Sequence, residues 1–254
     1  FKTVTLAAAI EKLPHLESRT WDCQGSIRIG DDTITCSGVH GEQDIQAALT
    51  NSCNVAFAQI AGELGGSVLK SYTEKAGLTD RYSVDGLPTA RGTFDFEGIS
   101  DADLGWAGIG QYHDLVNPCA LMVYMGAIAN GGKAAEPRLI EKTVDSLGLS
   151  NPIRVTRKTG TLIRPETAGT LADMMAVTAK DAYGTRRFPN MDLCAKSGTA
   201  EVGEGKKPHA WFAGFLRNPD APYAFVVLVE NGGSGSAAAG TVAGRVLDTI
   251  VNGY

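Results

Sequence analysis

Several features are absent from this sequence, and each absence excludes a class of protein. No apolar run approaches the ~20 residues that a helix needs to span a bilayer, and no basic segment leads into an apolar core and a cleavage site. Basic runs are also missing, and 28 acidic residues outnumber 23 basic ones. Since this balance attracts no phosphate backbone, we expect no nucleic acid partner.

The beginning of the chain has no starting methionine. Its first residues, FKTV, run directly into a helical pattern. We therefore expect a fragment of a longer protein, with any membrane anchor or signal segment upstream. Hydrophobic residues make up 43% and charged residues 20% of the 254 positions, which predicts a substantial core. The sequence contains neither a composition break nor an internal repeat.

Cysteine is present but never as a C-x-x-C pair. The spacing therefore gives a zinc site little support, and we expect neither a metal nor another cofactor. Cys23 and Cys36 flank a predicted hairpin over residues 25–35, which would bring their sulfurs together. A bridge between Cys36 and Cys53 is the alternative, and five reduced thiols are the third possibility. The five cysteines are Cys23, Cys36, Cys53, Cys119 and Cys194.

The apolar periodicity predicts helices at both ends of the chain, further helices in the middle and antiparallel strands late in the sequence. One of the helices follows a cap at Asn51 or Ser52 and ends at Gly65-Gly66. The other predicted helices are 3–13, 42–49, 118–130, 165–178 and 240–251. The predicted strand segments begin near 138–140 and include 191–195, 209–216 and 223–230. This order indicates an α/β or α+β fold.

Two short motifs suggest acyl transfer by a serine. Such chemistry needs a base near the hydroxyl, a proton donor for the leaving amine and an oxyanion hole. One known set of motifs for it is S-x-x-K, S-D-N and K-T-G. The chain offers Ser52-Cys53-Asn54 for the second element and Lys196-Ser197-Gly198-Thr199 for the third. Each is weak alone, but the first stands at a predicted helix start and the second on a strand before a hairpin.

The amino-acid sequence around these motifs resembles that of the penicillin-binding protein transpeptidase family, most closely its monofunctional class B members. The resembling segments are ALTNSCNVAF (48–57), GIGQ (108–111), AIANGG (127–132), AKSGTAE (195–201) and HAWFAGF (209–215). The resemblance implies a β-lactamase/transpeptidase-like α/β (α+β) fold, with an antiparallel sheet flanked by helices and a mostly helical subdomain. Residues 1–254 would form one transpeptidase domain, truncated at its N-terminus just after the nucleophile position.

The first motif departs from the family pattern. Family members read S-x-x-K at the start of the helix that begins here at Phe1 and Lys2. Lys2 fits the motif lysine, so the nucleophilic serine is expected two positions before Phe1, outside this sequence. Serine and lysine three residues apart share a helix face, which is why the chemistry uses that spacing. The fragment is therefore expected to carry the base without the nucleophile and to be unable to acylate itself.

The resemblance implies catalytic roles for Lys2, Ser52, Asn54 and Lys196. Lys2 would take the proton of the serine, its charge disfavoured by the helix N-terminus and by Lys196. Ser52 would relay a proton to the departing D-alanine amine, and Asn54 would hold Lys2 and the substrate amide. Lys196 would supply positive potential.

The same resemblance implies a substrate-binding role for Ser197, Gly198 and Thr199. Ser197 and Thr199 would bind the terminal carboxylate of the substrate, and the Thr199 backbone N–H would form half of the oxyanion hole. Serine in place of the usual threonine keeps the hydroxyl. The segment Lys158-Thr159-Gly160 spells K-T-G more literally, but it precedes a proline-started helix instead of lying on a strand before the hairpin.

Simpler interpretations exist for several of these residues. Ser52 could only cap its helix, and Asn54 could only bond to the backbone of the first turn. Lys2 could be a solvated helix lysine. His209 is interpreted as a structural histidine, because the lysine-based machinery needs no imidazole.

The function predicted from the resemblance is D,D-transpeptidation of peptidoglycan stem peptides through an acyl-serine, with β-lactam antibiotics acylating the same serine. A β-lactamase or D,D-carboxypeptidase is an alternative, although no glutamate position matches a deacylating base. A non-catalytic penicillin sensor or scaffold is another, although its motifs should be degraded. The expected partners include a glycosyltransferase or divisome or elongasome proteins. The expected location is the extracytoplasmic face of the bacterial membrane, through an anchor outside this chain.

Overall fold

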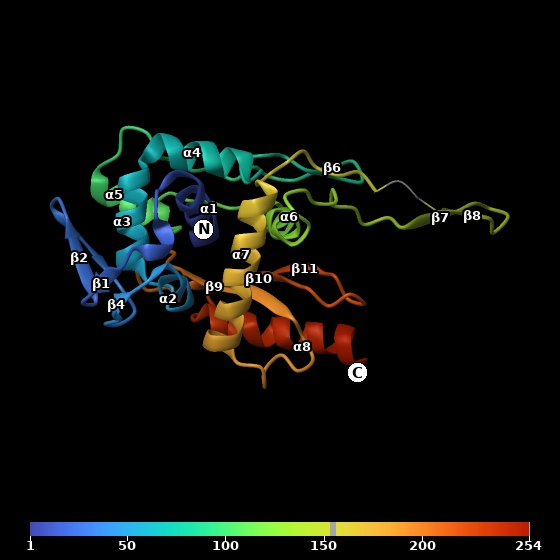
Figure 1. The fold of residues 1–254 in the computed structure, drawn as a ribbon. Coiled ribbons are helices and arrows are strands. Elements are labelled where there is room, and N and C mark those ends of the chain that lie inside the picture. The colour runs from blue at the N-terminus through green and yellow to red at the C-terminus, as the bar shows by residue number, and fades with distance from the viewer. Residues whose placement is uncertain (153–155, 254) are drawn as a thin grey trace.

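The computed structural model describes residues 1–152 and 156–253 and has a mixed α/β architecture (Figure 1). A three-stranded antiparallel sheet has the order β11-β10-β9. β10 (His209–Leu216) pairs with both β9 (Leu193–Ala200) and β11 (Ala224–Val229). The strand over 209–216 and the antiparallel hairpin that follows it are thus confirmed. The placement of β9 at an edge leaves one side of that strand free to border a site.

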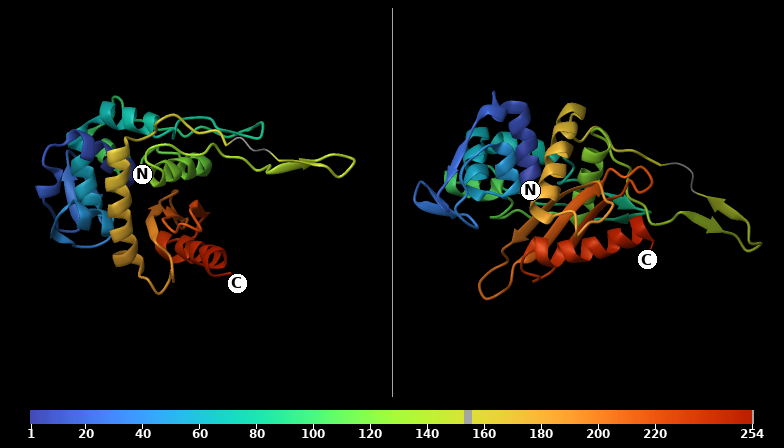
Figure 2. Two further views of the ribbon diagram at one scale, coloured as in Figure 1. Left: turned by 45° about the vertical axis from the view of Figure 1, so that its right-hand side comes forward. Right: turned by 60° about the horizontal axis from the view of Figure 1, so that its bottom comes forward.

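Both faces of this sheet are covered by helices. Along β10, Ala213 and Phe215 belong to one hydrophobic core and Ala210 and Phe212 to another, as expected because successive strand residues point to opposite faces. The first core includes α6 (Pro118–Ala129) and α7 (Pro165–Thr178). The second includes the π-helix η3 (Gly235–Ala239) and α8 (Gly240–Asn252). Figure 2 shows the sheet between these two layers.

Helix α1 (Lys2–Lys12) lies at the centre of the remaining helices. Residues 3–9 are all buried, because the helix contacts other helices on several sides. It packs against α3 (Asn54–Leu64), α4 (Gly66–Lys75) and α7. Around this group lie α2 (Ile45–Thr50), α5 (Asp101–Gly108) and the short 3-10 turn η1 (Leu16–Ser18). The surrounding helices therefore fix the position of the first turn of α1.

Two nested strand pairs connect α1 to α2. The outer pair is β1 (Trp21–Cys23) with β4 (Gly41–Gln43), and the inner pair is β2 (Ser26–Ile29) with β3 (Asp32–Thr35). The inner pair is the hairpin that the sequence predicts around Gly30-Asp31. All five cysteines of the chain are free thiols. Neither of the two disulfides considered from the sequence is therefore formed.

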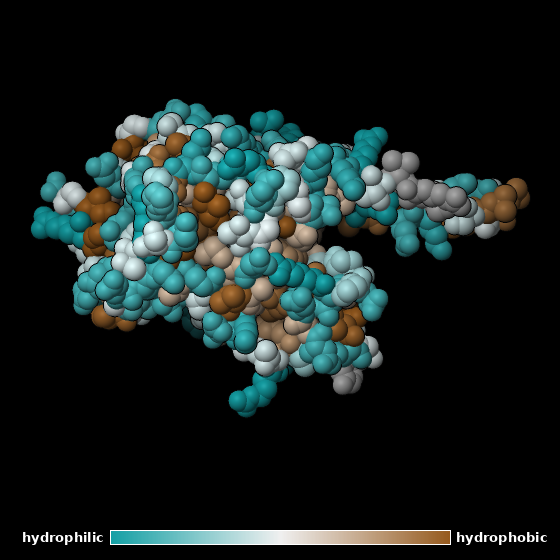
Figure 3. All heavy atoms as spheres, in the orientation of Figure 1, coloured by the Kyte–Doolittle hydropathy of each residue, from teal (hydrophilic) through white to brown (hydrophobic). Residues whose placement is uncertain are grey.

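A long two-stranded arm projects from the body of the molecule between α6 and α7 (Figure 1). It contains β7 (Lys142–Val144) and β8 (Ser150–Pro152), and a smaller pair, β5 (Ser83–Val84) with β6 (Leu87–Pro88), lies near its base. Hydrophobic residues mark the tip of the arm (Figure 3), where Leu147 is 82% exposed. Within the described ranges, no helix has both the length and the apolar character needed to cross a membrane.

Some predicted elements need correction. The cap of α3 is Cys53, not Asn51 or Ser52: the Cys53 sulfur accepts the Ala56 N–H at 3.4 Å, while Ser52 adopts a left-handed conformation with φ of 53°. Helices α4 and α5 were not predicted, because each follows a glycine- or loop-rich segment with a weak apolar pattern. The strand expected from 138–140 begins instead at Lys142.

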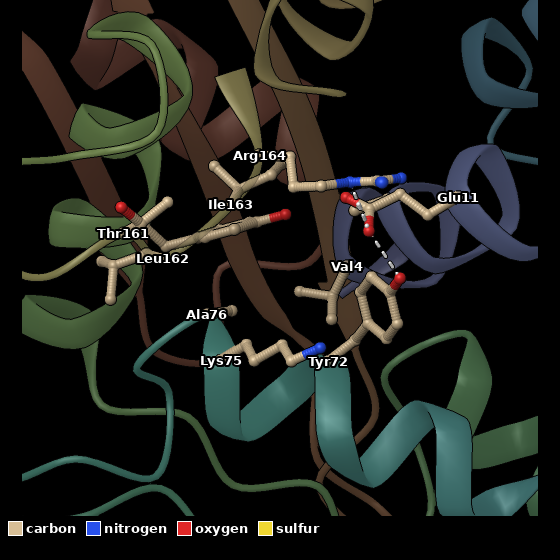
Figure 4. Close-up of a pocket in the computed structure, with 11 residues that line it drawn as sticks. Val4, Glu11, Tyr72, Lys75, Ala76, Thr161, Leu162, Ile163 and Arg164 are labelled. Carbon is tan, nitrogen blue, oxygen red and sulfur yellow. Dashed lines mark hydrogen bonds and ion pairs between the residues drawn. The ribbon is translucent and has the colours of Figure 1, made fainter. Parts of the chain in front are cut away.

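A buried carboxylate joins three of the helices. Glu11 of α1 accepts hydrogen bonds from Tyr72 of α4 at 2.7 Å and from Thr167 of α7 at 2.7 Å. Arg164 Nε lies 2.8 Å from the same carboxylate, and Figure 4 shows it together with Glu11 and Tyr72. Glu11, Tyr72 and Arg164 border a pocket that also includes Val4. Burial alone would raise the pKa of Glu11, but the donors outweigh it and hold the pKa below its ordinary 4.5.

We expect Glu11→Gln to lower the free energy of unfolding at pH 7 by about 1–3 kcal/mol, because the amide leaves buried donors without their charged acceptor. A carboxylate whose pKa is depressed on folding stabilises above its ordinary 4.5 and loses that contribution as the pH falls through the folded value. The difference between wild type and variant should therefore shrink from pH 6 to about pH 3 in urea titrations.

The matched control is Glu63→Gln, which removes a surface ion pair with Arg19. Because Glu63 is 47% exposed, its loss should change the stability by at most about 1 kcal/mol. Equal effects of the two substitutions would contradict the role assigned to Glu11.

Candidate active site

The first predicted site contact joins α1 to α3. The Lys2 amine donates a hydrogen bond to the side-chain oxygen of Asn54 at 2.9 Å. Asn54, the first residue of α3, is itself held because its Nδ2 donates to the Thr35 carbonyl at 2.8 Å. Lys2 is half-buried, and its amine lies 5.9 Å from the centre of the Phe57 ring. The structure thus brings together two residues that are 52 positions apart.

Ser52 lies in the tight turn between α2 and α3. Its backbone N–H donates to the Leu49 carbonyl at 3.1 Å, and its left-handed conformation reverses the chain before Cys53 caps α3. The side chain is half-buried. Because Ser52 is not the cap, the simple capping interpretation from the sequence does not hold.

Lys196 reaches the same region from β9, the edge strand of the sheet. Its amine donates to the Ser197 carbonyl at 2.9 Å, and it lies near enough to Lys2 for the two amines to repel. Burial lowers the pKa of Lys196 to about 7, and Lys2 adds to the effect. Burial also lowers the pKa of Lys2 to about 8, although Cys36 and Cys53 raise it in part. A neutral amine is therefore accessible near neutral pH, which is the requirement for a general base.

The hydroxyls of the Lys-Ser-Gly-Thr segment contact elements that the sequence did not single out. The Tyr183 hydroxyl, at the end of the π-helix η2 (Ala179–Tyr183), donates to Ser197 Oγ at 3.0 Å and accepts the Ser197 N–H at 2.7 Å. Thr199 Oγ1 accepts the Gly235 N–H at 3.1 Å. Neither Tyr183 nor Gly235 belongs to a recognisable motif, so no signal in the sequence could have found them.

Close packing explains why residue 235 is glycine. A methyl group at this position would overlap the carbonyl oxygens of Gly198 and Trp211. The start of η3 therefore lies directly against the Lys-Ser-Gly-Thr strand and supports it from behind. A second contact to this strand comes from the GIGQ segment, where the Gln111 side chain donates to the Thr199 carbonyl at 3.1 Å.

The two residues set aside in the sequence make other contacts. Lys158 is exposed and pairs with Ala135 in an isolated bridge at the base of the arm. His209 begins β10, and its Nδ1 accepts the Asn231 N–H at 3.0 Å. A ring nitrogen engaged by the backbone in this way agrees with the structural interpretation of this histidine.

The pocket drawn in Figure 4 is separate from these groups. It lies along Val4, Ala7 and Glu11 of α1. At 100° per residue, these three share one face of the helix, and Lys2 points roughly to the opposite face. The predicted site therefore borders the sheet edge and not this pocket.

Comparison with known proteins decides the family. The family model for the penicillin binding protein transpeptidase domain matches residues 1–252. The chain belongs to this family. The resemblance seen in the sequence motifs is thereby confirmed over nearly the whole chain.

Individual members of the transpeptidase family support this assignment. The peptidoglycan D,D-transpeptidase PbpA of Mycolicibacterium smegmatis is 28% identical over 94% of this chain and 50% of its own length. PbpA of Mycobacterium tuberculosis is 30% identical over 82% of this chain and 44% of its own. The chain thus spans about half the length of the curated relatives it matches.

Solved structures of this family have the same fold. Penicillin-binding protein A of M. tuberculosis, solved as a ceftriaxone acyl-enzyme complex, superposes with a TM-score of 0.88 at 26% identity, over 98% of this chain and 59% of that one. The D,D-transpeptidase domain of a peptidoglycan glycosyltransferase from Eggerthella lenta has a TM-score of 0.86 at 23% identity, over 100% of this chain and 64% of that one. The second likeness concerns the fold alone.

We expect the stability of this transpeptidase-family chain to report the charge of Lys196. Below a pH of about 7, the folded-state pKa of Lys196, the amine is protonated in both the folded and the unfolded chain. The cost of burying its charge then lowers the stability by its full amount. Between this pKa and the ordinary 10.5 the unfolded chain binds more protons, so stability rises with pH. The stability of wild type relative to Lys196→Met should therefore rise between pH 7 and pH 9, by at most about 1.4 kcal/mol per pH unit.

Urea titrations at several pH values measure this difference, with Lys158→Met as the exposed control. For the control, the free energy of unfolding should depend on pH in the same way as for wild type. The same pH dependence in Lys196→Met would show that Lys196 keeps its charge throughout this pH range.

Proposed function

We propose that this chain is the transpeptidase domain of a peptidoglycan D,D-transpeptidase that works through an acyl-serine. The carrying observation is the hydrogen bond from Lys2 to Asn54, which joins the lysine of the first motif to the asparagine of the second. The named activity of the PbpA relatives supports the same reaction. Residues 1–254 would form one domain, with its β-lactamase/transpeptidase-like sheet region and a mostly helical subdomain.

In the proposed reaction the nucleophile is a serine two positions before Phe1. The neutral Lys2 amine takes the proton of this serine, and the serine oxygen attacks the carbonyl of the penultimate D-alanine. When the tetrahedral intermediate collapses, the C–N bond breaks and the leaving D-alanine amine receives a proton through Ser52. The acyl-serine then reacts with an amine of a second stem peptide, which restores the serine hydroxyl.

The Lys-Ser-Gly-Thr strand would bind the substrate and stabilise charge. Lys196 supplies positive potential, and the hydroxyls of Ser197 and Thr199 receive the terminal carboxylate beside Gly198. The Thr199 N–H, on the edge strand, would donate to the developing oxyanion, a contribution of about 3 kcal/mol for one such donor. Before substrate binds, these hydroxyls contact Tyr183 and the Gly235 N–H, so the strand is already oriented.

The cellular setting is part of the proposal. A transpeptidase of this kind acts on the extracytoplasmic face of the bacterial membrane, where its peptidoglycan stem peptides lie, and is anchored by a segment outside this chain. β-Lactams would acylate the same serine, and the related M. tuberculosis protein has been solved as a ceftriaxone acyl-enzyme complex. A glycosyltransferase, or divisome or elongasome proteins, would supply the glycan strands.

The test uses the longer protein that contains the residues before Phe1. Fluorescent penicillin should label its serine, and the acyl-enzyme mass should persist. Lys196→Ala should slow acylation by at least about 100-fold, because the positive potential at the carboxylate is lost. The exposed Lys158→Ala should acylate at the rate of wild type.

Several outcomes would contradict the proposal. The absence of a serine at the expected position, or of any adduct, would exclude acyl-serine chemistry. Hydrolysis of the adduct within seconds would indicate a β-lactamase or D,D-carboxypeptidase. Loss of acylation in Lys158→Ala alone would place the third motif at the other segment.

A further inference from the structure

Three cysteines and a histidine come together beside the Ser-Cys-Asn turn. Cys23 ends β1, Cys36 follows β3, His40 precedes β4 and Cys53 caps α3. Their sulfur and ring-nitrogen atoms all lie within 4.8 Å of one another. Cys23 and Cys53 are buried, and the other two are half-buried. Four ligand-type groups from four segments therefore converge on one point.

Two of the six separations are close to the edges of a tetrahedron around zinc. The sulfurs of Cys36 and Cys53 are 3.9 Å apart, and the Cys36 sulfur is 3.6 Å from His40 Nδ1. With Zn–S bonds of about 2.3 Å and Zn–N bonds of about 2.0 Å, tetrahedral angles place two sulfurs about 3.8 Å apart and a sulfur and a nitrogen about 3.5 Å apart. Since all four atoms lie within 4.8 Å of one another, no separation would have to shorten by more than about 1 Å for one ion to bind them all.

We propose that Cys23, Cys36, His40 and Cys53 bind one zinc ion as a closed structural site. Thiolate and imidazole ligands favour zinc over the oxygen-seeking Mg²⁺ and Ca²⁺, and four protein ligands are typical of structural zinc. The expectation from the sequence that no metal is bound depended on the missing C-x-x-C spacing. The nested strand pairs remove that objection, because they bring together ligands separated by 12, 3 and 12 residues.

Backbone donors already face the sulfurs. The Asn54 N–H donates to Cys36 Sγ at 3.2 Å, and the Ala56 N–H donates to Cys53 Sγ at 3.4 Å. Both donors belong to the first turn of α3, whose N-terminus favours negative charge. Such outer-shell hydrogen bonds stabilise and orient metal-bound thiolates. The site therefore has supporting groups as well as ligands.

Zinc at this position would hold the Ser-Cys-Asn turn in place. Cys53 lies between Ser52 and Asn54, so one metal bond fixes the main chain of that turn, and the other three attach it to β1, β3 and the segment before β4. Each of these strands has only three or four residues, too little to be rigid alone. Zinc binding here involves only the metal, its four ligands and the main chain, so it does not depend on the proposed reaction.

A disulfide between Cys36 and Cys53 is the competing use of these thiols. It would join the same two segments but leave Cys23 and His40 without a partner of comparable strength. It also leaves the convergence of all four groups unexplained. The two possibilities exclude each other, since a disulfide sulfur is not a thiolate ligand.

The first experiment measures metal in the purified 254-residue chain by elemental analysis, under reducing conditions and after dialysis against zinc chloride. We expect about one zinc ion per chain, and at least about tenfold less in Cys36→Ser and in His40→Ala. Cys119→Ser is the matched control, because this half-buried cysteine lies outside the cluster, and it should keep the full zinc content.

The second experiment needs no variant and so does not depend on a variant folding. Cobalt(II) chloride added to the metal-free chain should give the intense visible bands of a tetrahedral thiolate site, which zinc chloride should abolish. Zinc should also slow amide hydrogen exchange of the peptide covering residues 52–57, and a chelator should reverse the effect.

Clear results would overturn the zinc site. A chain without zinc or cobalt bands under these conditions contradicts it, as does equal zinc loss in Cys119→Ser. A chain prepared without reductant whose mass is lower by two hydrogens, with a Cys36–Cys53 peptide after digestion, assigns the thiols to a disulfide instead.

Discussion

The hydrogen bond between Lys2 and Asn54 is the contact on which the arrangement of the site depends. It links the first turns of α1 and α3, so it forms only when both helices lie at a fixed distance and angle. The packing of α1 against α3, α4 and α7 fixes one partner, and the Thr35 carbonyl fixes the other. The Glu11 contacts, nine residues beyond Lys2 along the helix, keep α1 from rotating or sliding.

Two lysines in one half-buried site lower the stability of the fold, because their charges are partly removed from water. Burial lowers the pKa of Lys196 to about 7, and the charge of Lys2 adds to this effect. Burial also lowers the pKa of Lys2 to about 8, against the raising effect of Cys36 and Cys53. Neutral amines still donate hydrogen bonds, and both do so here. A site that destabilises the fold in order to hold a base near its working pH is typical of functional residues.

Local patterns in the sequence predict helices and strands, but they do not predict contacts between segments that are far apart in the chain. Helices 118–129 and 165–178 begin at a proline and are rich in apolar residues, so their bounds are predicted within a residue. The motifs predict Lys2, Ser52, Asn54 and Lys196 as site residues through a family resemblance. Tyr183 and Gly235 meet the motif strand only in the folded chain, and no periodicity marks them. The sequence did not predict Cys53 as the cap of α3, because the usual capping residues accept the backbone N–H through a side-chain oxygen and not through sulfur.

The cysteine cluster shows that a metal site, too, can depend on contacts between distant segments that sequence spacing does not predict. Spacing rules for zinc describe ligands held by one short turn, where C-x-x-C is needed because the chain itself sets the geometry. Here strand pairing sets it: β1 beside β4 brings Cys23 toward His40, and the β2–β3 hairpin returns Cys36 to the same end. Cys53 then joins from a turn that must already be tight, since Ser52 and Asn54 flank it. The cluster therefore depends on the same chain reversal that places Ser52 and Asn54.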